Sequence, residues 1–441
     1  MIRATLLGVL VFLLAASLPA AESNFEIHYP TSGEQGKLPV DVYYYLWIPP
    51  GVEKLRGVIV HQHGCGTGAE QGGITAAQDL HWQALARKWD CALLGSSYRA
   101  GDGGNCRHWC DPRNGSSETF LQALSDFAEK SQHPELKEVP WCLWGHSGGG
   151  FWASLMQVKY PERIVAIWFR SGTAFPTWQK GDIAKPEIPA AAYQVPAMGN
   201  PGFKEKTEPR FKGAWDGLVA MHSAYRAEGA PFGLAPDPRT GHECGDSRYL
   251  AIPFFDACLE MRLPEKGSSG QKLRPIDQKI AWLAAPDADT AQPAADYPGD
   301  PKGAIWLPNE AFAQKWQEYV KTGATSDTTP PPAPRELQAQ RKDDGVELTW
   351  SAAADFESGL QAFVIEREGE VVGQVPEKPV GRFGRPLFQT MSYHDTPERP
   401  LAEMKFLDKG AKEGAHRYRV RAVNSAGLKS ELSGEAMVKG K

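Results

Sequence analysis

The residues best suited to chemistry gather in residues 144–150, which read WGHSGGG. Ser147 stands between Gly145 and Gly149 in the pattern G-x-S-x-G, after a strand-like run and before a helix-like run. Glycines on both sides permit a sharp strand-to-helix turn in which backbone segments approach closely and the serine oxygen projects above the sheet. We therefore predict that Ser147 is a nucleophile. The competing interpretation is a glycine-rich turn with an ordinary hydroxyl.

This motif, set among repeated strand–helix units, resembles the α/β-hydrolase family over roughly residues 24–263. The resemblance implies a serine ester hydrolase that works through an acyl-enzyme. It also implies a catalytic triad in the chain order serine, acid, histidine.

His242 is the predicted proton-transferring base. It lies in residues 240–244, TGHEC, after a strand-like run and before a helix, and it is last in the implied order. An imidazole titrates near neutral pH, and a polar loop leaves it free to shuttle a proton. The competing histidines lack that order or setting: His61, His63, His81, His108 and His222.

The sequence indicates the carboxylate of the triad less clearly. The resemblance places it beyond the strand that follows the next helix–strand pair after the serine, often as G-x-x-D. Gly202 and Glu205 form the pattern G-x-x-E there, so Glu205 is predicted to hold the imidazole tautomer. Glu208 and Asp216 are its rivals. Two lysines flank Glu205, a setting that is more typical of a solvated surface carboxylate.

An oxyanion hole needs two backbone N–H donors aimed at the developing charge. By the resemblance, Gly148 supplies one of them. The other is expected from residues 63–66, HGCG, which follow an apolar strand. Cys65 is the predicted donor and Gly66 the alternative. The competing interpretation is a simple glycine turn.

Two patterns suggest metal ligands. His61 and His63 form H-x-H and would share one face of a strand, but no carboxylate–histidine partner motif follows. Cys106 and Cys110 lack the second ligand pair of a zinc site. We expect neither a metal nor a cofactor.

Two loops are expected to shape the substrate pocket, residues 101–115 and 173–192. Trp109 and Trp178 within them are predicted to stack on a sugar or aromatic ring, although a loop tryptophan as often packs under its own loop. His146, beside the nucleophile, is the third predicted substrate-binding residue.

The expected substrate is an acetyl or feruloyl ester carried by a carbohydrate or polymer. Three alternatives stay open. They are a depolymerase of polyhydroxyalkanoate-type polyesters, a serine peptidase or amidase with the same triad, and a non-catalytic adhesion protein on a hydrolase scaffold.

The elements that must position these residues alternate between strand and helix. Such units with short connections predict an α/β fold, a mostly parallel sheet with helices on both faces. The predicted strands are 25–30 and 40–48, which form a hairpin, and then 56–64, 91–98, 139–145, 163–170, 193–199 and 231–236. The predicted helices are 74–89, 116–131, 149–160, 213–229 and one that contains 249–255. Residues 264–325 are predicted as an extended strap that ends in a helix at 309–323.

A second domain is predicted after the proline-rich linker at residues 326–334. Short alternating runs follow at 345–350, 363–368 and 418–424, which is typical of a small β-sandwich over residues 335–441. With Trp350 and Tyr418 in strands, residues 335–438 resemble a fibronectin type III domain, apart from a long insert at 375–405. The resemblance implies a spacer or a platform for partners.

Residues 1–21 have the layout of a secretory signal peptide, with one early arginine, an apolar run and small residues at the end. The apolar run is shorter than the ~20 residues of a membrane span, which disfavours an anchor. We therefore expect a secreted or periplasmic protein without a membrane span after cleavage. Seven cysteines in an oxidising compartment predict disulfides and at least one free thiol, with Cys142 the best candidate.

The composition excludes several classes of protein. The chain of 441 residues is 41% hydrophobic and contains 14 Trp, which excludes a disordered or fibrous protein. Its length predicts two or three domains. A net charge of -5 with well-mixed charges disfavours a nucleic-acid partner.

Overall fold

The computed structural model of the chain describes residues 23–34, 36–66, 72–101, 104–266, 272–378 and 404–440. The predicted signal peptide at 1–21 lies outside the described residues, as does most of the insert predicted at 375–405. Among the described helices, none is long and apolar enough to cross a membrane.

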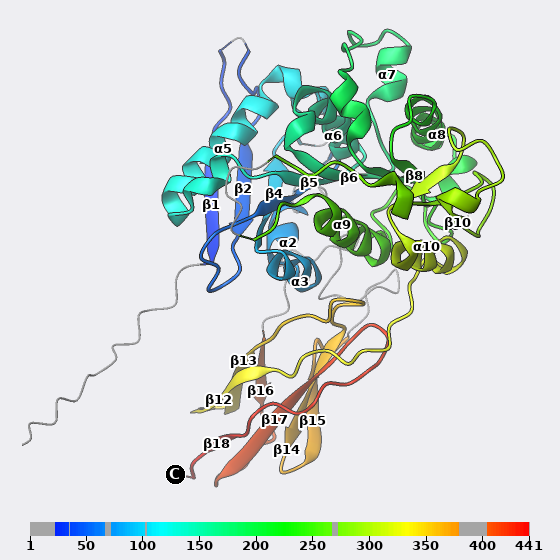
Figure 1. Cartoon of the computed structure of the whole chain (residues 1–441). Helices are drawn as coiled ribbons and strands as arrows, with labels where there is room; N and C mark the ends of the chain where they lie inside the picture. The colour runs from blue at the N-terminus through cyan, green and yellow to red at the C-terminus, as the bar shows by residue number, and fades with distance from the viewer. Residues whose placement is uncertain are drawn as a thin grey trace, which may run out of the picture.

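Eight strands form one sheet in the order β1-β2-β4-β3-β5-β6-β7-β8 (Figure 1). The first three in this order pair antiparallel, and all later neighbours pair parallel. The predicted opening hairpin and mostly parallel sheet are thus confirmed, and the architecture is that of the α/β-hydrolase fold. The strands are β1 Asn24–Tyr29, β2 Val42–Trp47, β3 Gly57–Gln62, β4 Cys91–Tyr98, β5 Trp141–His146, β6 Ile164–Arg170, β7 Ala197–Asn200 and β8 Phe232–Leu234.

Helices cover both faces of this sheet. Helices α5, α6 and α8 lie on one face and α2, α3, α9 and α10 on the other, with a separate buried core beneath each group (Figure 1). The helices are α2 Gly72–Gln78, α3 Leu80–Lys88, α4 Arg107–Cys110, α5 Ser116–Ser131, α6 Gly148–Lys159, α7 Phe175–Gln179, α8 Lys212–Ala227, α9 Arg248–Arg262 and α10 Glu310–Thr322.

The single helix predicted for residues 74–89 is wrong, because the chain forms α2 and α3 there. The carboxylate of Asp79 accepts hydrogen bonds from the backbone N–H groups of His81 and Trp82. An aspartate in this role caps the first turn of a new helix, which interrupts the continuous one.

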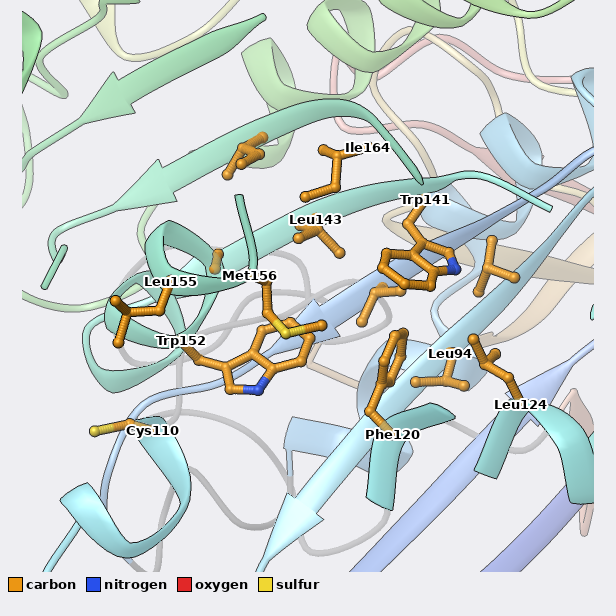
Figure 2. Packing of buried hydrophobic residues seen from close by; sticks show 14 of the residues in the cluster. Leu94, Cys110, Phe120, Leu124, Trp141, Leu143, Trp152, Leu155, Met156 and Ile164 are labelled. Atoms are coloured by element: carbon orange, nitrogen blue, oxygen red, sulfur yellow. The ribbon is translucent and has the colours of Figure 1, made fainter. Parts of the chain in front are cut away.

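Aromatic side chains hold β5 and α6 together. Phe120 of α5 lies between Trp141 of β5 and Trp152 of α6 (Figure 2). Its ring centroid is 5.1 Å from that of Trp141 and 5.4 Å from that of Trp152, both edge to face, an arrangement that aromatic quadrupoles favour. The contact fixes the two elements that flank Ser147.

The segment predicted as an extended strap contains a small sheet that the sequence did not indicate. β9 Trp282–Ala284, β10 Gln292–Pro293 and β11 Ile305–Leu307 pair in the order β10-β9-β11. The helix predicted at 309–323 is present as α10. Its Tyr319 donates a hydrogen bond to Asp237, so the segment packs beside the loop that carries His242.

The C-terminal domain is a sandwich of two antiparallel sheets, β12-β13-β16 and β15-β14-β17-β18. Trp350 and Tyr418 are both part of its core. Leu80 of α3 joins the same buried cluster, so the two domains are in contact (Figure 1). The strands are β12 Arg335–Lys342, β13 Gly345–Ser351, β14 Ala362–Arg367, β15 Glu370–Val375, β16 Lys405–Asp408, β17 His416–Val423 and β18 Ala436–Val438.

Candidate active site

Ser147 occupies a strained turn between β5 and α6. Its φ is 53° and its ψ is -114°, a region that non-glycine residues rarely adopt. The turn closes tightly, because a Cβ on Gly145 would lie 2.5 Å from the carbonyl oxygen of Gly149, and a Cβ on Gly149 would overlap the carbonyl of Gln62. The backbone N–H of Ser147 donates to the carbonyl of Arg170. The two glycines of G-x-S-x-G are thus required by backbone contact.

The structure brings Ser147, His242 and Glu205 together in one chain of hydrogen bonds. Nε2 of His242 lies 2.9 Å from Oγ of Ser147, and Nδ1 lies 2.5 Å from Oε1 of Glu205. Oε2 of Glu205 accepts from the backbone N–H of Gly202. A nucleophile bonded to a base that a buried carboxylate orients can carry out acyl transfer.

Glu205 is fully buried although both neighbouring lysines are exposed. A turn of 3-10 helix, Phe203–Lys206, directs it inward. The rival Asp216 lies on α8, where it is exposed and paired with Lys212. Glu208 is half-buried, and its backbone N–H and C=O form hydrogen bonds within the turn that leads into α8.

Arg170, at the end of β6, holds the loop that carries His242. Its Nη2 donates to Thr240 Oγ1 and to the carbonyl of Gly241, both at 2.9 Å, and its Nε donates to the carbonyl of Glu243. Its Nη1 donates to the carbonyl of Asn200 on β7. We did not predict this residue from the sequence. The available signal was a charged residue closing an otherwise apolar strand, IVAIWFR.

Phe211 is a second residue that the sequence did not reveal. Its ring stacks on the imidazole of His242 with centroids 3.8 Å apart and planes 5° apart. The stack covers one face of the imidazole and fixes its orientation. Nothing in the local sequence, TEPRF, marks this contact, which arises from tertiary packing.

The loop predicted to supply an oxyanion donor lies against the nucleophile. A Cβ on Gly64 would lie 2.9 Å from Cβ of Ser147. Cys65 forms a disulfide with Cys106, and this bridge packs on Gly148, where a Cβ would lie 2.5 Å from the Cys65 sulfur. The disulfide therefore links the Cys65 segment to the N-cap of α4 and packs against the Gly148 segment. Cys142 is buried and forms no disulfide, which confirms the free thiol expected there.

The two predicted pocket tryptophans are packed in the interior. Trp109 is 1% exposed and stacks on Tyr98 with ring centroids 4.8 Å apart. Trp178 is 2% exposed and contacts Phe175 edge to face. Their loops do meet, because Arg113 donates a hydrogen bond to the carbonyl of Ala184 (residues 173–192).

Three histidines are buried beneath the nucleophile. His146 is fully buried, and its Nε2 lies 2.6 Å from the carbonyl oxygen of His242 rather than toward a substrate. His61 and His63 both contact the ring of Trp144. Burial lowers the pKa of His63 to about 4 and the pKa values of the other two well below the usual range, so all three rings are neutral at pH 7.

The chain is similar to known proteins in structure only. No protein-family model matches the chain, and no curated protein matches it. A poly(aspartic acid) hydrolase from Sphingomonas sp. KT-1 is 14% identical with a TM-score of 0.34, over 50% of this chain and 93% of that one. An S-formylglutathione hydrolase from Agrobacterium tumefaciens is 13% identical with a TM-score of 0.36, over 56% and 96%.

The C-terminal part of the chain also has a structural likeness. A fibronectin-III array of RIM-binding protein is 16% identical with a TM-score of 0.18, over 25% of this chain. The match spans 35% of the array's own length.

Proposed function

We propose that the protein is a serine ester hydrolase that acts through an acyl-enzyme. The observation that supports this most directly is the continuous chain from Ser147 Oγ through the imidazole of His242 to the buried carboxylate of Glu205, at 2.9 and 2.5 Å. Three side chains from distant parts of the sequence meet in the order that acyl transfer requires.

In the proposed reaction, Ser147 Oγ attacks the ester carbonyl carbon while His242 Nε2 accepts the hydroxyl proton. Glu205 holds the tautomer that leaves Nε2 free to accept, and it stabilises the imidazolium that forms. The backbone N–H groups of Gly148 and Cys65, with Gly66 as the alternative to Cys65, stabilise the tetrahedral oxyanion. His242 then gives its proton to the leaving alcohol, and a water molecule releases the acyl group by the reverse sequence of steps.

The proposed substrate is an acetyl or feruloyl ester on a carbohydrate or polymer outside the cell. The Cys65–Cys106 disulfide supports an oxidising compartment, in agreement with the signal peptide predicted at residues 1–21. The sandwich is proposed to be a fibronectin type III-like spacer or platform, and its two sheets of three and four strands are compatible with that role.

The test is Ser147→Ala against a matched control, Ser223→Ala, whose hydroxyl is exposed on α8. Hydrolysis of p-nitrophenyl acetate and labelling by a fluorophosphonate should fall by about 10⁴-fold or more in the first variant and stay unchanged in the second. Retained hydrolysis in Ser147→Ala, with an unchanged circular dichroism spectrum, would refute the proposal. A panel of acetylated xylan, feruloylated sugar, short polyester and peptide then identifies the substrate class.

A further inference from the structure

A second cluster of reactive side chains lies directly beneath the proposed catalytic centre. His63, His146 and Cys244 are all buried, and one donor atom of each lies within 4.8 Å of the other two. The sulfur of Cys244 is 3.9 Å from Nδ1 of His63. Sulfur and nitrogen ligands of a tetrahedral zinc ion lie about 3.6 Å apart, so this pair needs a shift of only a few tenths of an ångström.

We propose that His63, His146 and Cys244 together bind one zinc ion. Two imidazole nitrogens and a thiolate form a borderline-soft donor set, which suits zinc and disfavours magnesium and calcium. Three protein donors leave one position of a tetrahedral ion for water or an anion.

The outer contact of His146 fits the same role. Nε2 of His146 lies 2.6 Å from the carbonyl oxygen of His242, and a metal-bound histidine commonly donates its second N–H to such a carbonyl.

The H-x-H pattern pairs His63 with His61, which is not among the proposed ligands. His61 lies in β3 and His63 directly follows that strand, but the donors that approach His63 come from residues more than 80 positions away. Only the parallel register of β3 and β5, and the return of the chain after β8, bring them together.

The place of each ligand indicates what the ion would do. His63 stands two residues before Cys65, His146 directly precedes Ser147, and Cys244 follows His242 by two residues. One ion would therefore join the oxyanion segment, the nucleophile turn and the histidine loop. The proposed role is to hold these three segments together, and zinc binding does not depend on the hydrolase proposal.

The test measures metal in the full-length protein, purified without a histidine tag or chelator. Mass spectrometry of the metal content should give one zinc ion per chain in the wild type and in Ser147→Ala. The content should fall at least tenfold in Cys244→Ser and in His63→Gln. Cys258→Ser, which alters a buried cysteine outside the proposed site, is the matched control and should retain the ion.

Cobalt supplies a readout that needs no variant. Co²⁺ titrated into metal-free wild type should produce a thiolate-to-cobalt charge-transfer absorption that saturates at one equivalent, and this band should be missing from Cys244→Ser. The site is refuted if folded wild type binds neither zinc nor cobalt above the level of that variant. If Cys244→Ser does not fold, the cobalt spectrum of the wild type still decides, because absence of a thiolate band excludes Cys244 as a ligand.

Discussion

In the hydrolase domain every residue of β5 is buried, whereas buried and exposed residues alternate along β17 of the sandwich. The end of β5 meets α6, and α6 meets the end of β3, so closely that Gly145 and Gly149 have no room for a Cβ. In the sandwich, a Cβ on Gly434 would meet no atom of the described residues within 4 Å. Close backbone contact thus shapes the turn that carries the proposed nucleophile, whereas Gly434 of the sandwich faces open space. Matched substitutions in the two domains should separate rate from stability.

Of these substitutions, Glu205→Gln is expected to have the largest effect on the rate of ester hydrolysis. The amide can still reach His242, but it cannot stabilise the imidazolium, and it can select the wrong tautomer. We expect kcat for p-nitrophenyl acetate to fall about 10³- to 10⁴-fold with little change in KM. Asp216→Asn, at the exposed rival carboxylate, is the control. An equal loss in both variants, or none in Glu205→Gln, would remove Glu205 from the triad.

The next effect is on packing, from Gly149→Ala against Gly434→Ala. A methyl group on Gly149 would overlap the carbonyl of Gln62, so the turn must shift, at a cost of about 3 kcal/mol or more. A displacement of about 1 Å at the nucleophile is expected to lower kcat by about 100-fold. Gly434→Ala should change the free energy of unfolding by less than about 0.5 kcal/mol. Similar unfolding curves for the two variants would erase the contrast between the domains.

The same contrast explains what the sequence could predict. Periodicity located β4 and α5 to the residue, because their patterns are local. The motif and its chain order placed Ser147, His242 and Glu205, which the structure brings together. Arg170 and Phe211 were missed, because their roles depend on contacts with a loop far away in the chain.

Acid should affect the two domains in opposite directions. Burial lowers the pKa of His222 to about 4 and of His81 to about 3, both in the hydrolase domain. As the pH falls, these histidines take up protons in the unfolded chain before they do so in the folded chain. Their contribution to the free energy of unfolding is therefore complete above about pH 6.5 and is lost as the pH falls toward about 4. At about pH 5.5 each of these histidines lowers the free energy of unfolding by about 1.4 kcal/mol.

In the sandwich, burial and then neighbouring acidic groups raise the pKa of Asp355 to about 7. The folded state therefore binds this proton first, and acidification from about pH 7 toward 4 stabilises the fold through it. Scanning calorimetry between about pH 7.5 and about 5 should show the hydrolase transition falling while the sandwich transition holds or rises. Parallel shifts of both transitions would contradict the assignment.

The smallest effect on rate is expected from the disulfide, which only the hydrolase domain possesses, since no cysteine follows Cys258. The Cys65–Cys106 bridge packs on Gly148, so its loss frees the segment that is proposed to supply one oxyanion donor. Cys65→Ser combined with Cys106→Ser should lower kcat about tenfold, less than the roughly 10²- to 10³-fold typical of removing a donor outright, because the loop can still visit the productive position. Cys110→Ser, at an unbridged cysteine of α4, is the control. In the wild type, a reductant should produce the same loss of kcat and leave the melting temperature of the sandwich unchanged. If kcat in the double variant is unaltered, contacts other than the disulfide hold the loop in place.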